Sequence, residues 1–126
     1  ILDIEQSHIA NCAYSQMQSA SALAAQCGVK LVAYEGGQHL VGIGSAQANS
    51  SLASLFKAAN RNSRMAGLYT SYLNNWITAG GDLFVHFKDV DAYSQFGSWG
   101  ALERQDQDPA TAPKHHALMQ FAQQNP

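Results

Sequence analysis

Apolar residues recur at helical spacing in several segments of the chain. Over residues 8–27 they predict a helix that begins after a Ser7 cap and ends at Gly28. A broad apolar stripe over residues 63–79 predicts a second long helix, which Gly80-Gly81 ends. A shorter helix is expected from Ser50 or Ser51 to about residue 59, and Pro113 is well suited to open a closing helix.

Two short apolar runs, residues 29–34 and 82–87, predict strands. Since helices separate these strands, we expect right-handed crossovers and parallel pairing. A parallel sheet of two strands leaves both edges open, whereas buried parallel sheets usually have more neighbours. The pattern predicts one α/β segment over residues 1–126, a parallel βαβα portion of a TIM-type (β/α)8 barrel that is incomplete on its own. Such a chain should expose apolar surface or self-associate when isolated.

The composition narrows the choice of partner. Hydrophobic residues make up 46% of the 126, enough for a real core, and charged residues only 13%. The net charge is −2, and seven scattered Lys and Arg form no basic patch, which argues against nucleic acid or a membrane surface as partner. No apolar run is long enough to span a bilayer. A surface rich in uncharged polar residues favours neutral, hydroxyl-rich ligands. The start at Ile1, without Met or a leader, indicates a piece of a longer protein.

The only cysteines, Cys12 and Cys27, fall within the first predicted helix. Fifteen residues of helix separate them by about 22 Å, too far for a disulfide. Their position on the apolar side predicts two buried thiols and leaves the redox compartment open.

The carboxyl ends of the predicted strands carry the candidate chemistry. Glu35 ends the first strand and is followed by Gly36-Gly37, and His86 lies at the end of the second. Strict alternation places Glu35 on the face of Leu31 and Ala33. Long loops follow both strands and tight turns precede them, as at the active face of a barrel. We therefore expect Glu35 and His86 to project into one concave site, although Glu35 as an ordinary surface acid is an equal alternative.

The loop after the second strand is rich in aromatic residues. Trp99 lies between two glycines, with Tyr93 a few residues before it, a composition suited to stacking against a sugar ring. The alternative is that Trp99 covers the core beneath the loop. No metal or cofactor is expected: Gly42 to Ser45 form neither a dinucleotide fingerprint nor a nucleophile elbow, and the adjacent His115 and His116 cannot chelate one metal from a helix.

Taken in order, these motifs resemble the end of a clan-A (β/α)8 glycoside hydrolase. Residues 32–37 are similar to its seventh strand, residues 83–87 to its eighth, and the segments 97–103 and 113–118 to its final loop and helix. The resemblance implies a retaining glycosidase of polysaccharide or oligosaccharide degradation, without cofactor and secreted or periplasmic. Its further partners would be a carbohydrate substrate and the remaining N-terminal part of the barrel. The residues it implicates are Glu35 as nucleophile and, in contact with substrate, Tyr34, His39, His86, Tyr93 and Trp99.

One element of the family pattern is missing. The acid/base of such enzymes lies on the fourth strand after an Asn, and this chain has no Asn-Glu; Glu5 precedes the first predicted helix and Glu103 lies in the last loop. A retaining mechanism needs two carboxyl groups about 5–5.5 Å apart, so the chain alone should not hydrolyse glycosides efficiently. Two alternatives stay open: a non-catalytic carbohydrate-binding (cellulose-binding) domain, and a structural α/β subunit.

Overall fold

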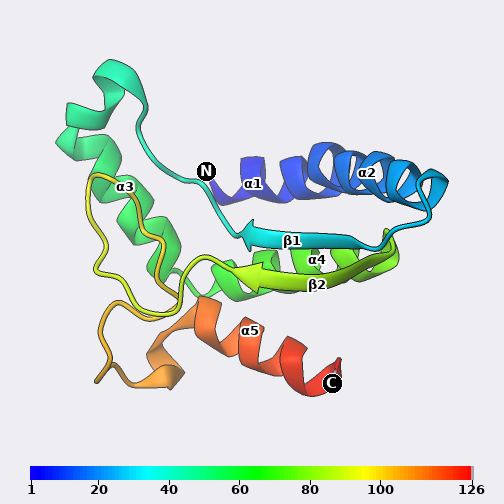
Figure 1. Ribbon diagram of the computed structural model, residues 1–126. Helices are drawn as coiled ribbons and strands as arrows, with labels where there is room; N and C mark the ends of the chain where they lie inside the picture. The colour runs from blue at the N-terminus through cyan, green and yellow to red at the C-terminus, as the bar shows by residue number, and fades with distance from the viewer. Residues whose placement is uncertain (126) are drawn as a thin grey trace.

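The computed structural model describes residues 1–125, a mixed α/β arrangement with two neighbouring parallel strands (Figure 1). The parallel pairing expected from the sequence is confirmed. In chain order, the elements are α1 (Leu2–His8), a π-helical turn (Ile9–Ala13), α2 (Tyr14–Gln26), β1 (Leu31–Gly36), a 3-10 turn (Gly44–Ala48), α3 (Ser50–Arg61), α4 (Arg64–Thr78), β2 (Gly81–His86), a second 3-10 turn (Pro109–Thr111) and α5 (Pro113–Gln124).

The first helix is longer than the sequence pattern predicts. Helical backbone runs from Leu2 through the π-helical turn to Gln26, so Ser7 lies inside it and is not its cap. A π-helical turn contains an extra residue and so rotates the apolar stripe of the next helical segment, α2. Cys12 and Cys27 are both free and exposed, and the expectation of two buried thiols is wrong.

The two strands have the same length but an irregular register. Leu31 pairs with Gly81, Ala33 with Phe84 and Gly36 with His86. Strand β2 therefore has one extra residue in the first interval, and β1 has one extra residue in the second. Because the two irregularities compensate, the strands begin and end level with each other. The extra residue in β1 lies between Ala33 and Gly36, where Tyr34 and Glu35 are.

The two faces of this sheet have different surroundings. Helix α4 lies behind the strands in Figure 1, and the Phe84 ring meets Tyr72 and Trp76 of that helix edge to face. Within residues 1–125, no helix lies in front of the strands in that view. The apolar side chains of this open face are exposed to different degrees: Val32 52%, Tyr34 87%, Leu83 61%, Val85 44% and Phe87 42%. The chain thus carries the exposed apolar surface that the sequence predicts for an incomplete sheet.

The main core lies among the helices. Leu2, Leu40, Met65, Leu68 and Ala117 belong to one buried cluster. Asn49 caps α3 by accepting a hydrogen bond from Leu52 N–H, so the cap lies just before the expected Ser50 or Ser51. Helix α5 begins at Pro113, as the sequence predicts. Among the described residues, no helix combines the length and apolar character needed to cross a membrane.

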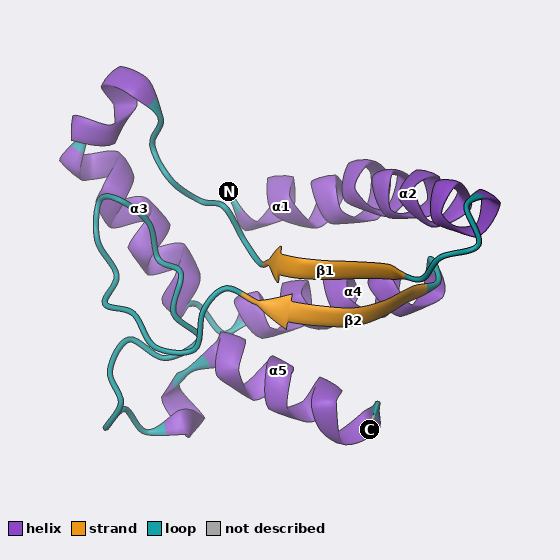
Figure 2. Cartoon of the chain, viewed as in Figure 1, coloured by secondary structure: helices purple, strands orange, loops and turns teal. Residues whose placement is uncertain are grey.

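The loops are asymmetric about the sheet, as expected. Figure 2 shows short turns leading into both strands and long loops leaving their carboxyl ends. Helix α2 ends at Gln26 only a few residues before β1, and α4 ends at Thr78 just before β2. The residues of functional interest therefore gather where the two strands end.

Candidate functional site

Glu35 lies on the open face of the sheet. The neighbouring Gly36 faces α4, since a Cβ atom built there would clash with Cζ of Phe84. Glu35 precedes Gly36 in an extended strand and its side chain is exposed. The expectation that Glu35 shares a face with Ala33 is wrong, because the extra residue in β1 reverses the alternation between them. The carboxylate thus projects away from the helices.

His86 lies on the other face, towards α4. Its Nε2 is 3.1 Å from the hydroxyl of Tyr69, and the two rings meet edge to face. Burial lowers the pKa of His86 to about 4, and the nearby Lys114 charge adds to this effect. The neutral imidazole is therefore the form present near pH 7. The expected shared site of Glu35 and His86 is wrong, because the two side chains lie on opposite faces of the sheet, and this placement counts against a barrel in which both point inward.

Three aromatic rings form a row at the carboxyl end of the strands. The Trp99 indole lies with its centroid 5.1 Å from that of His39 and 6.5 Å from that of Phe87. The backbone fixes this arrangement, since Lys88 N–H donates to the Trp99 carbonyl and Phe87 N–H donates to the Gly36 carbonyl. His39 and Tyr34 are exposed, and Trp99 is half-buried. Phe87, Trp99 and His39, called the aromatic row below, thus extend from the open face to the loop after β1.

Gly97 makes room for the Trp99 ring. Its φ of +136° is one that side-chain-bearing residues rarely adopt, and a Cβ atom there would clash with Cε2 of Trp99. The close approach of backbone and indole therefore requires glycine.

Replacing Gly97 with Ala should displace the Trp99 indole, because the added methyl group and the ring would occupy the same space. We expect a red-shifted and more quenchable Trp99 fluorescence with the rest of the fold retained. The matched control is Gly67→Ala, because a Cβ atom at that helical position meets nothing within 4 Å. Unchanged emission in Gly97→Ala would contradict this account of the loop.

Tyr93 lies in a polar network. Its hydroxyl donates to the Gly100 carbonyl at 3.3 Å, and its ring lies 4.6 Å from Nζ of Lys114 and 5.5 Å from the Arg61 guanidinium. Burial raises the pKa of Tyr93. Its position fits a structural role in the loop better than direct contact with a ligand.

Glu103 belongs to the same network. The Arg61 guanidinium donates to both carboxylate oxygens at 2.6 Å, and this pairing holds the pKa of Glu103 below its ordinary value. A general acid needs a raised pKa at neutral pH, so the ion pair argues against Glu103 as a proton donor in catalysis.

The structure also has a hollow on the helix side of the sheet. A pocket of about 360 Å³ lies between the first helix, α4 and the segment Gly37 to His39. Glu5, His8 and Gln16 are among its polar lining residues, and Leu68 is among the apolar ones. Neither Glu35 nor Trp99 lines it. In the described part of the chain, no group of three or more His, Cys, Asp or Glu residues could hold a metal ion.

Sequence reasoning missed three residues that organise this region. Gln38 N–H donates to the hydroxyl of Tyr69, and the Gln38 side chain and Lys114 both donate to the Ser98 carbonyl. Lys114 occupies the second position of a predicted helix, where a charged residue is usually solvated, so its complete burial left no sequence signal. Comparison of the chain with protein-family profiles, curated proteins and solved structures found no match.

Proposed function

We propose that this chain is the C-terminal part of a retaining glycoside hydrolase with a (β/α)8 barrel, in which Glu35 is the nucleophile. The observation that carries the proposal is the exposed carboxylate of Glu35 at the carboxyl end of β1, on the sheet face away from the helices. In a barrel, helices cover the outside, and catalytic groups lie at the carboxyl ends of the strands. Glu35 lies on the face away from the helices and at the carboxyl end of its strand, as a catalytic group of a barrel would.

The aromatic row supports a carbohydrate as the substrate. Trp99 offers an indole face beside the His39 imidazole, and Tyr34 is exposed on the same open face as Phe87. Aromatic faces bury the C–H surface of a sugar, while neighbouring polar groups bond its hydroxyls. Tyr34, His39 and Trp99 are the proposed substrate contacts, with Tyr93 and His86 supporting the loop and helix behind them.

The second carboxylic acid would come from the remaining part of the barrel. Both strand edges are unpaired within residues 1–125 and the open face is apolar, which suits the addition of further parallel strands. Those strands would bring an acid within the roughly 5–5.5 Å of Glu35 that a retaining mechanism requires. The test is labelling of the protein that carries this chain with a fluorosugar, followed by mass spectrometry to locate the modified residue.

The second candidate function is carbohydrate binding without hydrolysis. It is favoured by the Arg61–Glu103 ion pair, which removes one of the three glutamates from acid/base chemistry. In that case Trp99 and His39 bind sugar and Glu35 only accepts hydrogen bonds. Sugar binding by the wild type without turnover or labelling would favour this candidate.

Trp99→Ala should weaken sugar binding by roughly 1–3 kcal/mol, the usual loss for a buried aromatic contact. Calorimetric titration with cellohexaose, xylohexaose and mannohexaose would measure this change and show which sugar is preferred. Trp76→Phe is the control, because that indole packs under the sheet and donates to the Asp82 carbonyl. Equal affinity of wild type and Trp99→Ala for every sugar that binds would exclude Trp99 from the site.

A further inference from the structure

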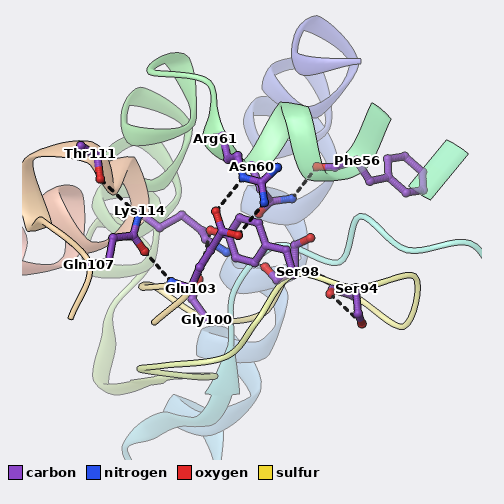
Figure 3. A network of polar contacts seen from close by, with 12 residues as sticks. Phe56, Asn60, Arg61, Ser94, Ser98, Gly100, Glu103, Gln107, Thr111 and Lys114 are labelled. Atoms are coloured by element: carbon purple, nitrogen blue, oxygen red, sulfur yellow. Dashed lines mark hydrogen bonds and ion pairs between the residues drawn. The ribbon is translucent and has the colours of Figure 1, made fainter. Parts of the chain in front are cut away.

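The Ser98 carbonyl joins three segments that are far apart in sequence. It accepts a hydrogen bond from Nε2 of Gln38 at 2.8 Å and a second from Nζ of Lys114. Gln38 belongs to the loop after β1, Ser98 to the loop after β2, and Lys114 to the first turn of α5. Two donors from different elements thus converge on one buried carbonyl (Figure 3 shows the Lys114 side).

Each loop residue at this junction is followed directly by a residue of the aromatic row. His39 follows Gln38 and Trp99 follows Ser98, and the two rings lie 5.1 Å apart. Gln38 is further held by Leu40 N–H, which donates to its Oε1 at 2.7 Å, and by its own N–H, which donates to Tyr69. The hydrogen bonds to Ser98 therefore set the relative position of the two loop backbones from which the rings project.

Lys114 is an unusual residue to find at such a junction. It is completely buried, with its ammonium group also over the Tyr93 ring. Glu103 and Asp91 favour its charge from the loop, while His86 on β2 and Arg61 on α3 also face this region. Burying a lysine costs free energy, and a methionine would fill the same space at lower cost. The buried ammonium group therefore points to a role other than filling space, namely the hydrogen bond to the Ser98 carbonyl.

We propose that Gln38 and Lys114 are positioning residues, which hold the His39–Trp99 pair in register through the Ser98 carbonyl. Their relevance to sugar recognition rests on the proposed function, but the geometric role does not. Neither residue touches the substrate in this arrangement. Each acts through the loop that carries an aromatic ring.

The test measures the ring pair directly in the protein that carries this chain. With selectively labelled histidine, the His39 ring protons report the ring current of the Trp99 indole, and Trp99→Ala gives the value without it. We expect Gln38→Met and Lys114→Met each to move the His39 resonances at least halfway towards the Trp99→Ala position. The same variants should raise KM or Kd for the preferred hexasaccharide several-fold, with kcat nearly unchanged.

Lys57→Met, on α3 and outside every ion pair of the described residues, is the matched control and should leave the His39 resonances in place. Since Ser98 keeps one donor in each single variant, both variants are expected to fold; should Lys114→Met fail to fold, Gln38→Met decides. Wild-type His39 resonances in a folded Gln38→Met or Lys114→Met protein would overturn the proposal. Absence of sugar binding by the wild type would instead count against the proposed function alone.

Discussion

Glu35→Gln is expected to lower kcat by three or more powers of ten while changing sugar affinity little. The amide keeps the shape and hydrogen-bonding reach of the side chain but cannot form the glycosyl-enzyme bond. The measurement uses the protein that carries this chain and an activated aryl glycoside, with binding followed separately by calorimetry. A fluorosugar with a good leaving group should trap the wild type and label Glu35 in a peptide map.

The control for this substitution is Glu5→Gln, a second glutamate, which lies on α1 and lines the helix-side pocket that Glu35 does not line. It should keep near wild-type kcat. A label on another residue would remove the nucleophile assignment, as would full activity in Glu35→Gln. Either result would leave carbohydrate binding as the better account of the aromatic row.

Lys114 should make the protein more stable as the pH rises from about 7 to 9.5. Burial lowers the pKa of Lys114 from 10.5 to about 7, although Glu103 and Asp91 oppose the shift. Over this interval the unfolded chain binds a proton that the folded chain does not, so the free energy of unfolding increases with pH. One such group contributes at most about 1.4 kcal/mol per pH unit. Above about pH 10 the trend should reverse, because burial raises the pKa of Tyr69 and Tyr93 in the folded state.

Urea unfolding at a series of pH values would measure this slope. Lys114→Met should flatten it, because the group that gains a proton on unfolding is gone, and Lys57→Met should retain it. An equal slope in wild type and Lys114→Met would show that Lys114 keeps its charge in the folded protein.

The sequence predicted the order of elements well, because their signals are local. The apolar stripe before Gly80-Gly81, the Pro113 helix start and the two apolar runs all reappear as α4, α5 and the parallel strands. The π-helical turn and the irregular strand register each depend on one extra residue, and the local apolar pattern does not predict where it lies. The π-helical turn at Ile9–Ala13 lies within the segment that carries Cys12, and nothing in the residue types marks it.

The candidate site was predictable in its location and only partly in its geometry. Glu35, His39 and Trp99 do lie at the strand ends, since parallel strands bring their following loops together. Strict alternation places Glu35 on the face of His86, but the extra residue in β1 turns Glu35 to the opposite face. The junction of Gln38, Ser98 and Lys114 depends on tertiary contacts. Ser98 is 60 positions from Gln38 and 16 from Lys114, so no local sequence pattern predicts these hydrogen bonds.

The irregular register between the two strands determines the direction of the Glu35 side chain, which the residue identity alone does not. Glu35 reaches the open face because β1 has three steps between Ala33 and Gly36 where β2 has two between Phe84 and His86. If β1 were regular at its present length, strict alternation from Ala33 would turn the acid towards α4 while leaving the glutamate in the sequence. Related chains can therefore keep every residue of the motif and still lose its chemistry through a change of strand pairing. In comparing them, the register around Glu35 is as informative as the glutamate itself.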